Sequence, residues 1–128
     1  ETLSPFCLGE LWCVFGCGGD RDRGKRPIMG RVALDGAQRV VLTSDNPRKE
    51  PPMQIIDEII EGIGEDREAV VVEPERALAI RYAVTMAAPE DVILIAGKGH
   101  ENYQELATGR IHFDDVEQAA SDLNRRAK

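Results

Sequence analysis

The sequence has few aromatic residues and no excess of positive charge. Aromatic residues make up 5% of the 128 residues, whereas hydrophobic residues as a whole make up 42%. A core of Val, Ile, Leu and Ala suits a layered α/β structure better than a surface that stacks nucleic-acid bases. The net charge of -7 also argues against nucleic acid, because phosphate backbones bind to basic faces. We therefore expect no nucleic-acid partner.

Cysteine pairs and long apolar runs are also missing from the sequence. Cys7, Cys13 and Cys17 form no CxxC pair and have no companion histidine cluster, so we expect no disulfide framework, no metal site and a reducing, cytoplasmic compartment. No apolar run approaches the roughly 18 residues of a membrane span, and no signal peptide is visible. Residues 1–10 are expected to be a linker remnant, and residues 11–128 one domain.

Apolar runs and helical stripes alternate along the chain. Strands are predicted at residues 11–15, 39–43, 70–72 and 92–96, and helices at 27–34, 52–62 and 75–87. In the third helix, the face predicted to be buried comprises Leu78, Ala79, Tyr82, Ala83 and Met86. A hairpin over 104–113 precedes a last helix to about residue 125, where Asp114 and Glu117 form a capping box. This order predicts an α/β, doubly wound, mostly parallel sheet with one or two antiparallel edge strands and helices on both faces.

Three polar loops follow predicted strands, at residues 16–26, 44–52 and 97–104. Because parallel strands end at one edge of a sheet, these loops are expected to converge there. The second contains the sequence Asp-Asn-Pro-Arg at positions 45–48. A guanidinium suits a carboxylate, and the neighbouring carboxylate and amide suit an ammonium group, so this loop fits a zwitterion such as an amino acid. The alternative is a solvated turn of the kind that Asn-Pro commonly forms.

The other two loops are less specific. Gly19 to Lys25 satisfies GxxxxGK, but Arg26 stands where a phosphate-binding loop has Ser or Thr. Its glycines and the following helix start still suit contact with an anion; the alternative is a glycine-rich turn whose Arg and Asp side chains pair with each other. The third loop is open to interpretation as a tight turn with surface charges, and His100 has no nucleophile partner in the sequence. We expect no catalytic residue in this chain.

Together the three loops resemble the C-terminal domain of the Mur ligases. The segments that carry the resemblance are Gly16 to Pro27, Asp45 to Arg48 and Ala96 to Glu101, within a match from about residue 11 to 123. The resemblance implies a Rossmann-like domain that binds the incoming amino acid and closes over ATP and Mg²⁺ held mainly by a central domain. It also implies a monomeric enzyme of peptidoglycan synthesis in the bacterial cytoplasm.

Within the family, the loops are most similar to those of ligases that add meso-diaminopimelate to UDP-N-acetylmuramoyl-L-alanyl-D-glutamate. The residues that the resemblance implies for binding meso-diaminopimelate are Arg21, Asp45, Asn46, Pro47, Arg48, Gly97 and Glu101. Arg48 is implied to pair with the distal carboxylate that lysine lacks, and Arg21 with the carboxylate at the reacting end. The residues implied to hold the distal amino group are Gly97 and Glu101, with Asp45 and Asn46. Asp20 and Lys25 are implied as possible contacts to ATP.

Several parts of the family pattern have no counterpart in these residues. The ATP-binding GKT loop, the carbamylated lysine, the magnesium ligands and the nucleotide-sugar domain are all missing from the sequence. The isolated domain is therefore expected to be inactive. Two alternatives remain open: a lysine-adding ligase of the same family, which the intact Arg48 disfavours, and a non-catalytic anion- or nucleotide-binding module, which the incomplete phosphate loop favours.

Overall fold

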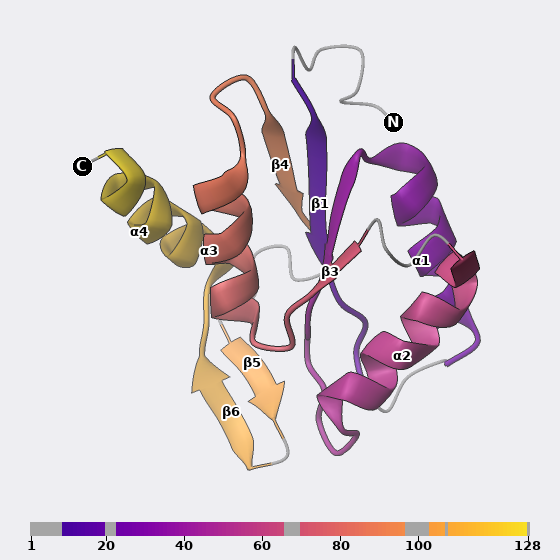
Figure 1. The fold of residues 1–128 in the computed structure, drawn as a ribbon. Coiled ribbons are helices and arrows are strands. Elements are labelled where there is room, and N and C mark those ends of the chain that lie inside the picture. Colours follow the sequence, from indigo (N-terminus) through magenta and orange to yellow (C-terminus); the bar gives the residue numbers. More distant parts are fainter. Residues whose placement is uncertain (1–8, 20–22, 66–69, 97–102, 107, 128) are drawn as a thin grey trace.

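The computed structural model describes residues 9–19, 23–65, 70–96, 103–106 and 108–127. Its strands are β1 (Leu11–Phe15), β2 (Arg39–Leu42), β3 (Val70–Val72), β4 (Val92–Ile95), β5 (Tyr103–Leu106) and β6 (Gly109–His112). Its helices are α1 (Lys25–Gly36), α2 (Pro52–Ile63), α3 (Arg76–Met86) and α4 (Asp115–Ala127) (Figure 1). None of the helices in these ranges is long and apolar enough to cross a membrane.

The main sheet is parallel and its strand order is β3-β2-β1-β4. The chain steps outward from β1 through β2 to β3, and α3 then leads back to place β4 on the free side of β1. Val14 of β1 accordingly lies between Val41 of β2 and Ile95 of β4. The direction in which successive strands are added to the sheet therefore reverses between β1 and β4. Open α/β sheets bind ligands at such a point, beyond the carboxyl ends of the strands.

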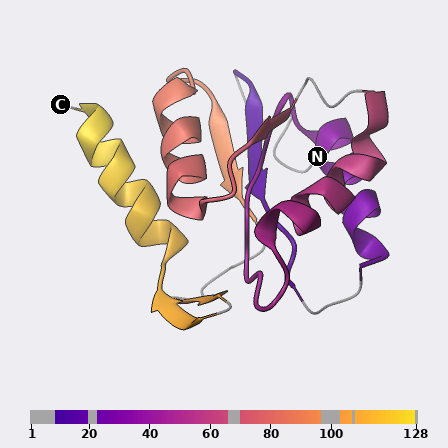
Figure 2. The same ribbon diagram turned by 60° about the horizontal axis from the view of Figure 1, so that its bottom comes forward.

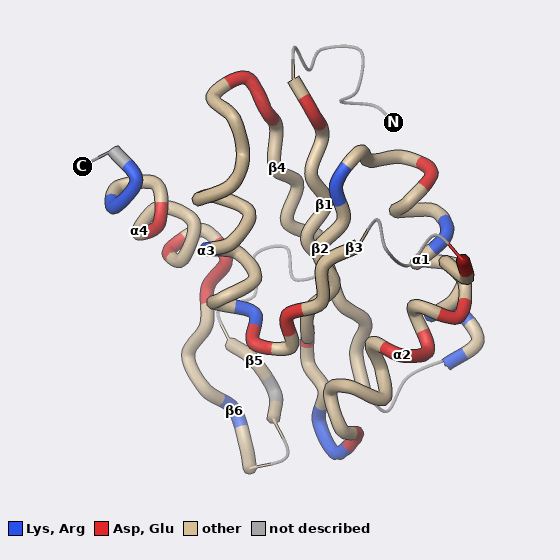
Figure 3. The backbone as a smooth tube through the Cα atoms, in the orientation of Figure 1, with Lys and Arg blue, Asp and Glu red and all other residues tan. Residues whose placement is uncertain are grey.

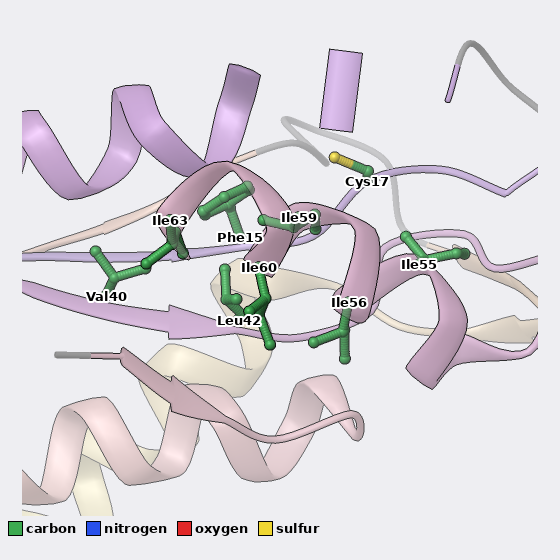
Figure 4. Packing of buried hydrophobic residues seen from close by; sticks show 9 residues of the cluster. All are labelled: Phe15, Cys17, Val40, Leu42, Ile55, Ile56, Ile59, Ile60 and Ile63. Atoms are coloured by element: carbon green, nitrogen blue, oxygen red, sulfur yellow. The ribbon is translucent and has the colours of Figure 1, made fainter. Parts of the chain in front are cut away.

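Helices cover both faces of this sheet. Figures 1 and 2 show α1 and α2 on one side of the strands and α3 and α4 on the other. Side chains alternate along β1, so Trp12 and Val14 pack toward α3, whereas Phe15 packs toward α2. The helix predicted at 52–62 is confirmed as α2, and its five isoleucines are buried against Phe15, Val40 and Leu42 (Figure 4). The α/β, doubly wound fold is therefore confirmed.

The predicted hairpin forms but does not extend the main sheet. β5 and β6 pair antiparallel, with Tyr103 opposite His112, as a separate two-stranded sheet. The predicted antiparallel strands are thus present, as a pair beside the main sheet rather than hydrogen-bonded to its edge. The side-chain amide of Gln104 donates to the Ser44 hydroxyl at 3.0 Å and to the Asp45 carbonyl at 2.8 Å. These bonds hold the hairpin against the loop after β2, beyond the carboxyl edge of the sheet.

The buried face of α3 differs from the predicted one. Ala79 and Ala83 are buried as expected, but Leu78 and Met86 are 40% and 59% exposed. The buried residues are Arg76, Ala79, Ile80, Ala83 and Val84, which follow helical spacing from the first residue of the helix. Burial of an arginine at the start of α3 sets the rotation of the helix, and periodicity of apolar residues alone misses it.

The ends of the elements differ only slightly from prediction. α1 begins at Lys25 rather than at Pro27, and α4 ends at Ala127. The predicted capping box at the start of α4 forms in one half: Asp114 Oδ1 accepts hydrogen bonds from the backbone N–H groups of Val116 and Glu117 at 2.8 and 3.1 Å, whereas the Glu117 side chain turns to His112. The Glu117 carboxylate lies 2.8 Å from His112 Nε2 and raises the pKa of that imidazole.

Candidate functional site

The loops that follow β1 and β2 lie against each other at the carboxyl edge of the sheet. The backbone N–H of Gly19 donates to the Asn46 carbonyl at 2.7 Å. The Arg48 guanidinium adds a second link between the loops: its Nη1 donates to the Gly19 carbonyl at 2.8 Å and to the Asn46 carbonyl at 3.3 Å. Asn46 and Pro47 are buried, whereas Asp45 and Arg48 are half-buried at the surface of the site. Two of the three predicted loops are thus brought together.

The glycines of the first loop allow this close approach. A Cβ atom on Gly19 would lie 1.8 Å from the Pro47 carbonyl oxygen, and one on Gly16 would lie 2.1 Å from that of Thr43. Both obstacles are backbone atoms, which cannot rotate away. These two glycines are therefore required for packing of one loop against the other.

Arg48 has an unusual backbone conformation. Its φ is 54°, the one positive φ of a residue other than glycine in the described ranges. Left-handed backbone is unfavourable for a residue with a Cβ, and it persists where the surrounding structure enforces it. Here the buried Pro47 on one side and the bonds of the guanidinium to Gly19 and Asn46 on the other fix the conformation. The guanidinium is thereby held in one place at the rim.

Arg26, the residue in place of the phosphate-loop Ser or Thr, is buried and structural. Its side chain is 1% exposed, and it donates to both Glu50 oxygens at 3.0 and 2.9 Å, to Glu58 at 3.0 Å and to the Gly18 carbonyl at 2.9 Å. Arg23 also pairs with Glu58, which lowers the pKa of that carboxyl to about 2, with Arg26 contributing. Figure 3 shows the basic start of α1 on the same side as the acidic positions of α2.

This arrangement bears on the predicted anion site. Arg23 and Arg26 both pair with glutamates outside their own loop, whereas the other charged residues of the predicted turn, at 20–22, lie outside the described residues. Lys25 remains exposed in the first turn of α1. Of the two predicted ATP contacts, Lys25 lies within the described residues and Asp20 does not. Lys25 stands at the N-terminal end of a helix, which favours negative charge nearby.

Arg76 joins the carboxyl edge from the other face, and the sequence analysis missed it. Its Nε and Nη2 donate to the two oxygens of Asp115 at 2.8 Å each, its Nη1 donates to the Ser44 carbonyl at 3.0 Å, and its Nη2 donates to the Ala96 carbonyl at 3.2 Å. The side chain is 0% exposed. A helical stripe that continues through an arginine, as at positions 76, 79, 80 and 83, is the signal that would have identified it.

A shallow cavity opens beside Arg48. Its volume is about 360 Å³, and it lies between residues 47–52 on one side and Leu106 and Thr108 of the hairpin on the other. Another cavity of about 320 Å³ lies at the opposite edge, at the starts of β1 and β2, where Trp12 and Arg39 contribute to its wall. That second cavity contains none of the predicted site residues. The cavity at Arg48 is the one that coincides with the sequence prediction.

Some predicted residues lie outside the described part of the chain: Asp20, Arg21, Gly97 and Glu101. Within the described ranges, no group of three or more His, Cys, Asp or Glu side chains is placed to hold a metal ion. Cys17 lies near the site, but burial raises the pKa of its thiol to about 11 and its Sγ contacts Met29 Sδ at 3.6 Å. A neutral, buried thiol is a poor nucleophile. The described site is therefore suited to binding and orienting a charged molecule.

Comparisons with known proteins agree with this geometry. The family described as "Mur ligase, glutamate ligase domain" matches residues 1–99. The chain is 59% identical over 126 residues to a protein of Synechococcus elongatus named UDP-N-acetylmuramoyl-L-alanyl-D-glutamate--2,6-diaminopimelate ligase, covering 98% of this chain and 25% of that protein. A protein of the same name from Thermosynechococcus vestitus is 55% identical over 128 residues, covering 100% of this chain and 26% of the relative.

A solved structure of a ligase with this name is similar in fold as well. It superimposes with a TM-score of 0.94 at 47% sequence identity, and the match covers 99% of this chain and 26% of that chain. The chain thus spans about a quarter of the length of the relatives that it matches.

Proposed function

The chain belongs to the Mur ligase family, and we propose on that basis that it is the amino-acid-binding domain of the ATP-dependent ligase that adds meso-diaminopimelate to UDP-N-acetylmuramoyl-L-alanyl-D-glutamate. The relatives that carry this name in the comparisons support the assignment. The reaction belongs to peptidoglycan synthesis, in the bacterial cytoplasm, and the enzyme acts as a monomer. We also propose that residues 11–128 are the domain and that residues 1–10 are the linker before it.

The observation that carries the proposal is the fixed position of Arg48. Two backbone carbonyls, those of Gly19 and Asn46, accept hydrogen bonds from its Nη1. A guanidinium is a planar fork that matches a carboxylate, and fixing one nitrogen orients the whole fork. The cavity bounded by residues 47–52 and the hairpin leaves space for a ligand beside it. Arg48 is therefore well placed to bind the distal carboxylate of meso-diaminopimelate, which lysine does not have.

The rest of the amino-acid site is proposed from the family motif. Asp45 and Asn46 precede Arg48 in the same loop, and with Gly97 and Glu101 they are proposed to hold the distal amino group. Arg21 is proposed to bind the carboxylate at the reacting end. An ammonium held by acidic and amide oxygens, between two carboxylates each held by an arginine, is the charge pattern of a diamino dicarboxylate.

The nucleotide is proposed to be shared with the rest of the enzyme. ATP with Mg²⁺ would supply the phosphoryl group that activates the glutamate carboxylate of UDP-N-acetylmuramoyl-L-alanyl-D-glutamate. On this chain, Lys25 at the exposed start of α1 and Asp20 before it are the residues proposed to contact ATP. The Nη atoms of Arg26 are bonded to Glu50, Glu58 and Gly18 in the interior, so this side chain is not available to a nucleotide at the phosphate-loop-like segment. The isolated domain is accordingly proposed to be inactive.

The test compares substrates in the full-length protein that contains this chain. We expect addition of meso-diaminopimelate to exceed addition of lysine strongly, and Arg48→Ala to raise KM for meso-diaminopimelate by roughly 100-fold, since loss of a charge-assisted bond costs about 2–3 kcal/mol. Arg39→Ala, at the opposite edge of the sheet, is the matched control and leaves KM unchanged. Equal turnover of lysine by the wild type, or unchanged KM in Arg48→Ala, contradicts the proposal.

A titration of this chain with ATP separates the enzyme domain from a nucleotide-binding module. Sub-micromolar affinity for ATP would favour the non-catalytic module. We expect weak binding, because Arg23 and Arg26 are neutralised by Glu58 and Glu50 and a site completed by domain closure lacks its other wall here.

A further inference from the structure

We propose that Arg76 is a positioning residue for the loop at 45–48, because it ties the residue that precedes this loop to the end of β4. This inference rests on the proposed function and adds a specificity-determining residue to it. Arg76 touches no ligand atom in this assignment. It acts through the backbone just after β2 and β4, and the loop at 45–48 directly follows the first of these points.

The acceptors of Arg76 show why its role differs from ordinary helix packing. The carbonyl that accepts from Nη1 belongs to Ser44, the residue directly before Asp45. One of the two acceptors of Nη2 is the carbonyl of Ala96, the residue directly before Gly97. One buried guanidinium therefore bonds both chains at the point where each enters its proposed ligand loop.

The strand order makes this bridge necessary. In the order β3-β2-β1-β4, strands β2 and β4 are separated by β1 and share no ladder of hydrogen bonds. Two strands that flank a third lie about 10 Å apart, and only sheet twist relates their ends. Because Ser44 and Ala96 both bond to one guanidinium, their carbonyls are closer together than the strands themselves. Arg76 thus ties the entry of the 45–48 loop to the end of β4, beyond the end of β1.

Asp115 holds Arg76 in the orientation that this bridge requires. Its carboxylate accepts in the bidentate mode, with Nε and Nη2 each at 2.8 Å, so the plane of the guanidinium is fixed. The carboxylate also supplies the opposite charge that a buried cation needs. Asp115 comes from the start of α4, so the last helix of the chain contributes to the geometry of loops far from it in sequence.

Gln104 provides an independent tie to the same segment. Its amide nitrogen donates to the Ser44 hydroxyl at 3.0 Å and to the Asp45 carbonyl at 2.8 Å, and the Ser44 hydroxyl donates in turn to the Pro74 carbonyl at 2.7 Å. Pro74 precedes α3 by two positions, so these bonds and those of Arg76 converge on one short stretch of chain. The segment 44–45 is therefore held from α3 and from the hairpin at once.

The test is Arg76→Lys in the full-length protein. Lysine keeps the positive charge beside Asp115, but a single ammonium cannot reproduce the fork and reach both carbonyls. We expect KM for meso-diaminopimelate to rise at least ~10-fold, because small misplacements of positioning groups have effects of this order. The values of KM for ATP and for the nucleotide-sugar substrate, and kcat at saturating amino acid, are expected to stay within about 3-fold of wild type. Preference for meso-diaminopimelate over lysine falls in parallel.

The matched control is Arg81→Lys. Arg81 lies on the same helix and also pairs with α4, through Asp122 at 3.4 Å, but this ion pair involves neither Ser44 nor Ala96. It is expected to leave every KM unchanged. If Arg76→Lys does not fold, as judged by circular dichroism, Gln104→Met decides: it removes the amide bonds to Ser44 and Asp45 with little change of volume, and it is expected to give the same selective rise in KM.

The outcomes separate this inference from the proposed function. A wild-type enzyme that does not use meso-diaminopimelate overturns the proposed function, and the same variants are then measured with the amino acid that it does use. A wild-type enzyme that does use it, together with a folded Arg76→Lys or Gln104→Met protein whose KM for it stays within about 2-fold, overturns the positioning role. A loss of activity that only follows the folded fraction, with KM unchanged, also overturns it.

Discussion

The two helical layers each bury one arginine at the carboxyl edge of the sheet, and the two arginines are held differently. Arg26, on the α1 and α2 side, pairs with the carboxylates of Glu50 and Glu58 and with one carbonyl. Arg76, on the α3 and α4 side, pairs with one carboxylate and two carbonyls. Their side chains are equally inaccessible, at 1% and 0% exposure. Burial alone therefore does not define their roles; the nature of the acceptors does.

The difference lies in how each centre responds to loss of charge. Arg26 has two acidic partners, and Glu58 has a second cation in Arg23, so removal of one group leaves the others compensated. Asp115 is the one carboxylate bonded to Arg76 among the contacts of the described chain. Removal of one charged group on the α1 and α2 side should therefore lower the free energy of unfolding less than removal of one on the α3 and α4 side.

The largest effect is expected for Asp115→Ala. It leaves the Arg76 charge buried without its carboxylate, and breaking a buried pair in this way costs about 3–5 kcal/mol. Urea denaturation monitored by circular dichroism measures the free energy of unfolding. The control is Asp35→Ala, which removes an exposed partner of Arg31 and is expected to cost less than about 1 kcal/mol. Equal losses in the two variants would show that Arg76 gains no more from its partner than a surface arginine does.

A smaller, pH-dependent effect is expected for Glu58→Gln. The folded-state pKa of Glu58 is about 2, below its ordinary value of 4.5, because of hydrogen bonds from Arg23 and then Arg26. Its stabilisation is thus fully present above about pH 4.5 and is lost as the pH falls toward 2. Glu58→Gln should cost about 1–2 kcal/mol at pH 7 and make stability less dependent on pH in this range. Urea midpoints of both proteins at about pH 7, 4 and 2.5 measure this difference. If the midpoints of wild type and variant change with pH in parallel, Glu58 does not contribute the expected pH dependence.

The smallest effect is expected for Asp114→Ala. This substitution removes the cap that accepts from the N–H groups of Val116 and Glu117, at a cost of about 1 kcal/mol. Asp114 and Asp115 are neighbours at the start of α4, so the pair of variants compares a solvent-exposed cap with a buried ion pair on one helix. A cost for Asp114→Ala as large as that for Asp115→Ala would mean that α4 depends on its cap rather than on Arg76.

The elements that depend on a short stretch of sequence were predictable. The isoleucines of α2 recur at helical spacing, and β1 and β2 are continuous apolar runs. Both patterns lie within one short segment, and both predict burial. The approach of the loops after β1 and β2 followed from parallel topology. Both buried arginines escaped prediction because their partners are distant in the chain: Arg76 and Asp115 are 39 positions apart, and Arg26 and Glu58 are 32 positions apart.

The hairpin shows the same limit. Its two strands were predictable because the turn between them is local, but its separation from the main sheet depends on Gln104, which bonds to Asp45 across 59 positions. The burial of Arg76 likewise set the face of α3, which apolar spacing placed incorrectly at Leu78 and Met86. Polar contacts between distant segments, rather than hydrophobic periodicity, account for these differences.

The positive φ of Arg48 places folding and recognition in conflict at a single residue. The backbone there favours glycine or asparagine, while the proposed ligand favours a guanidinium. Sequences selected for stability alone would abandon arginine at this position. An arginine in this conformation is a point of local frustration, where the residue costs folding stability and the proposed binding role accounts for its presence.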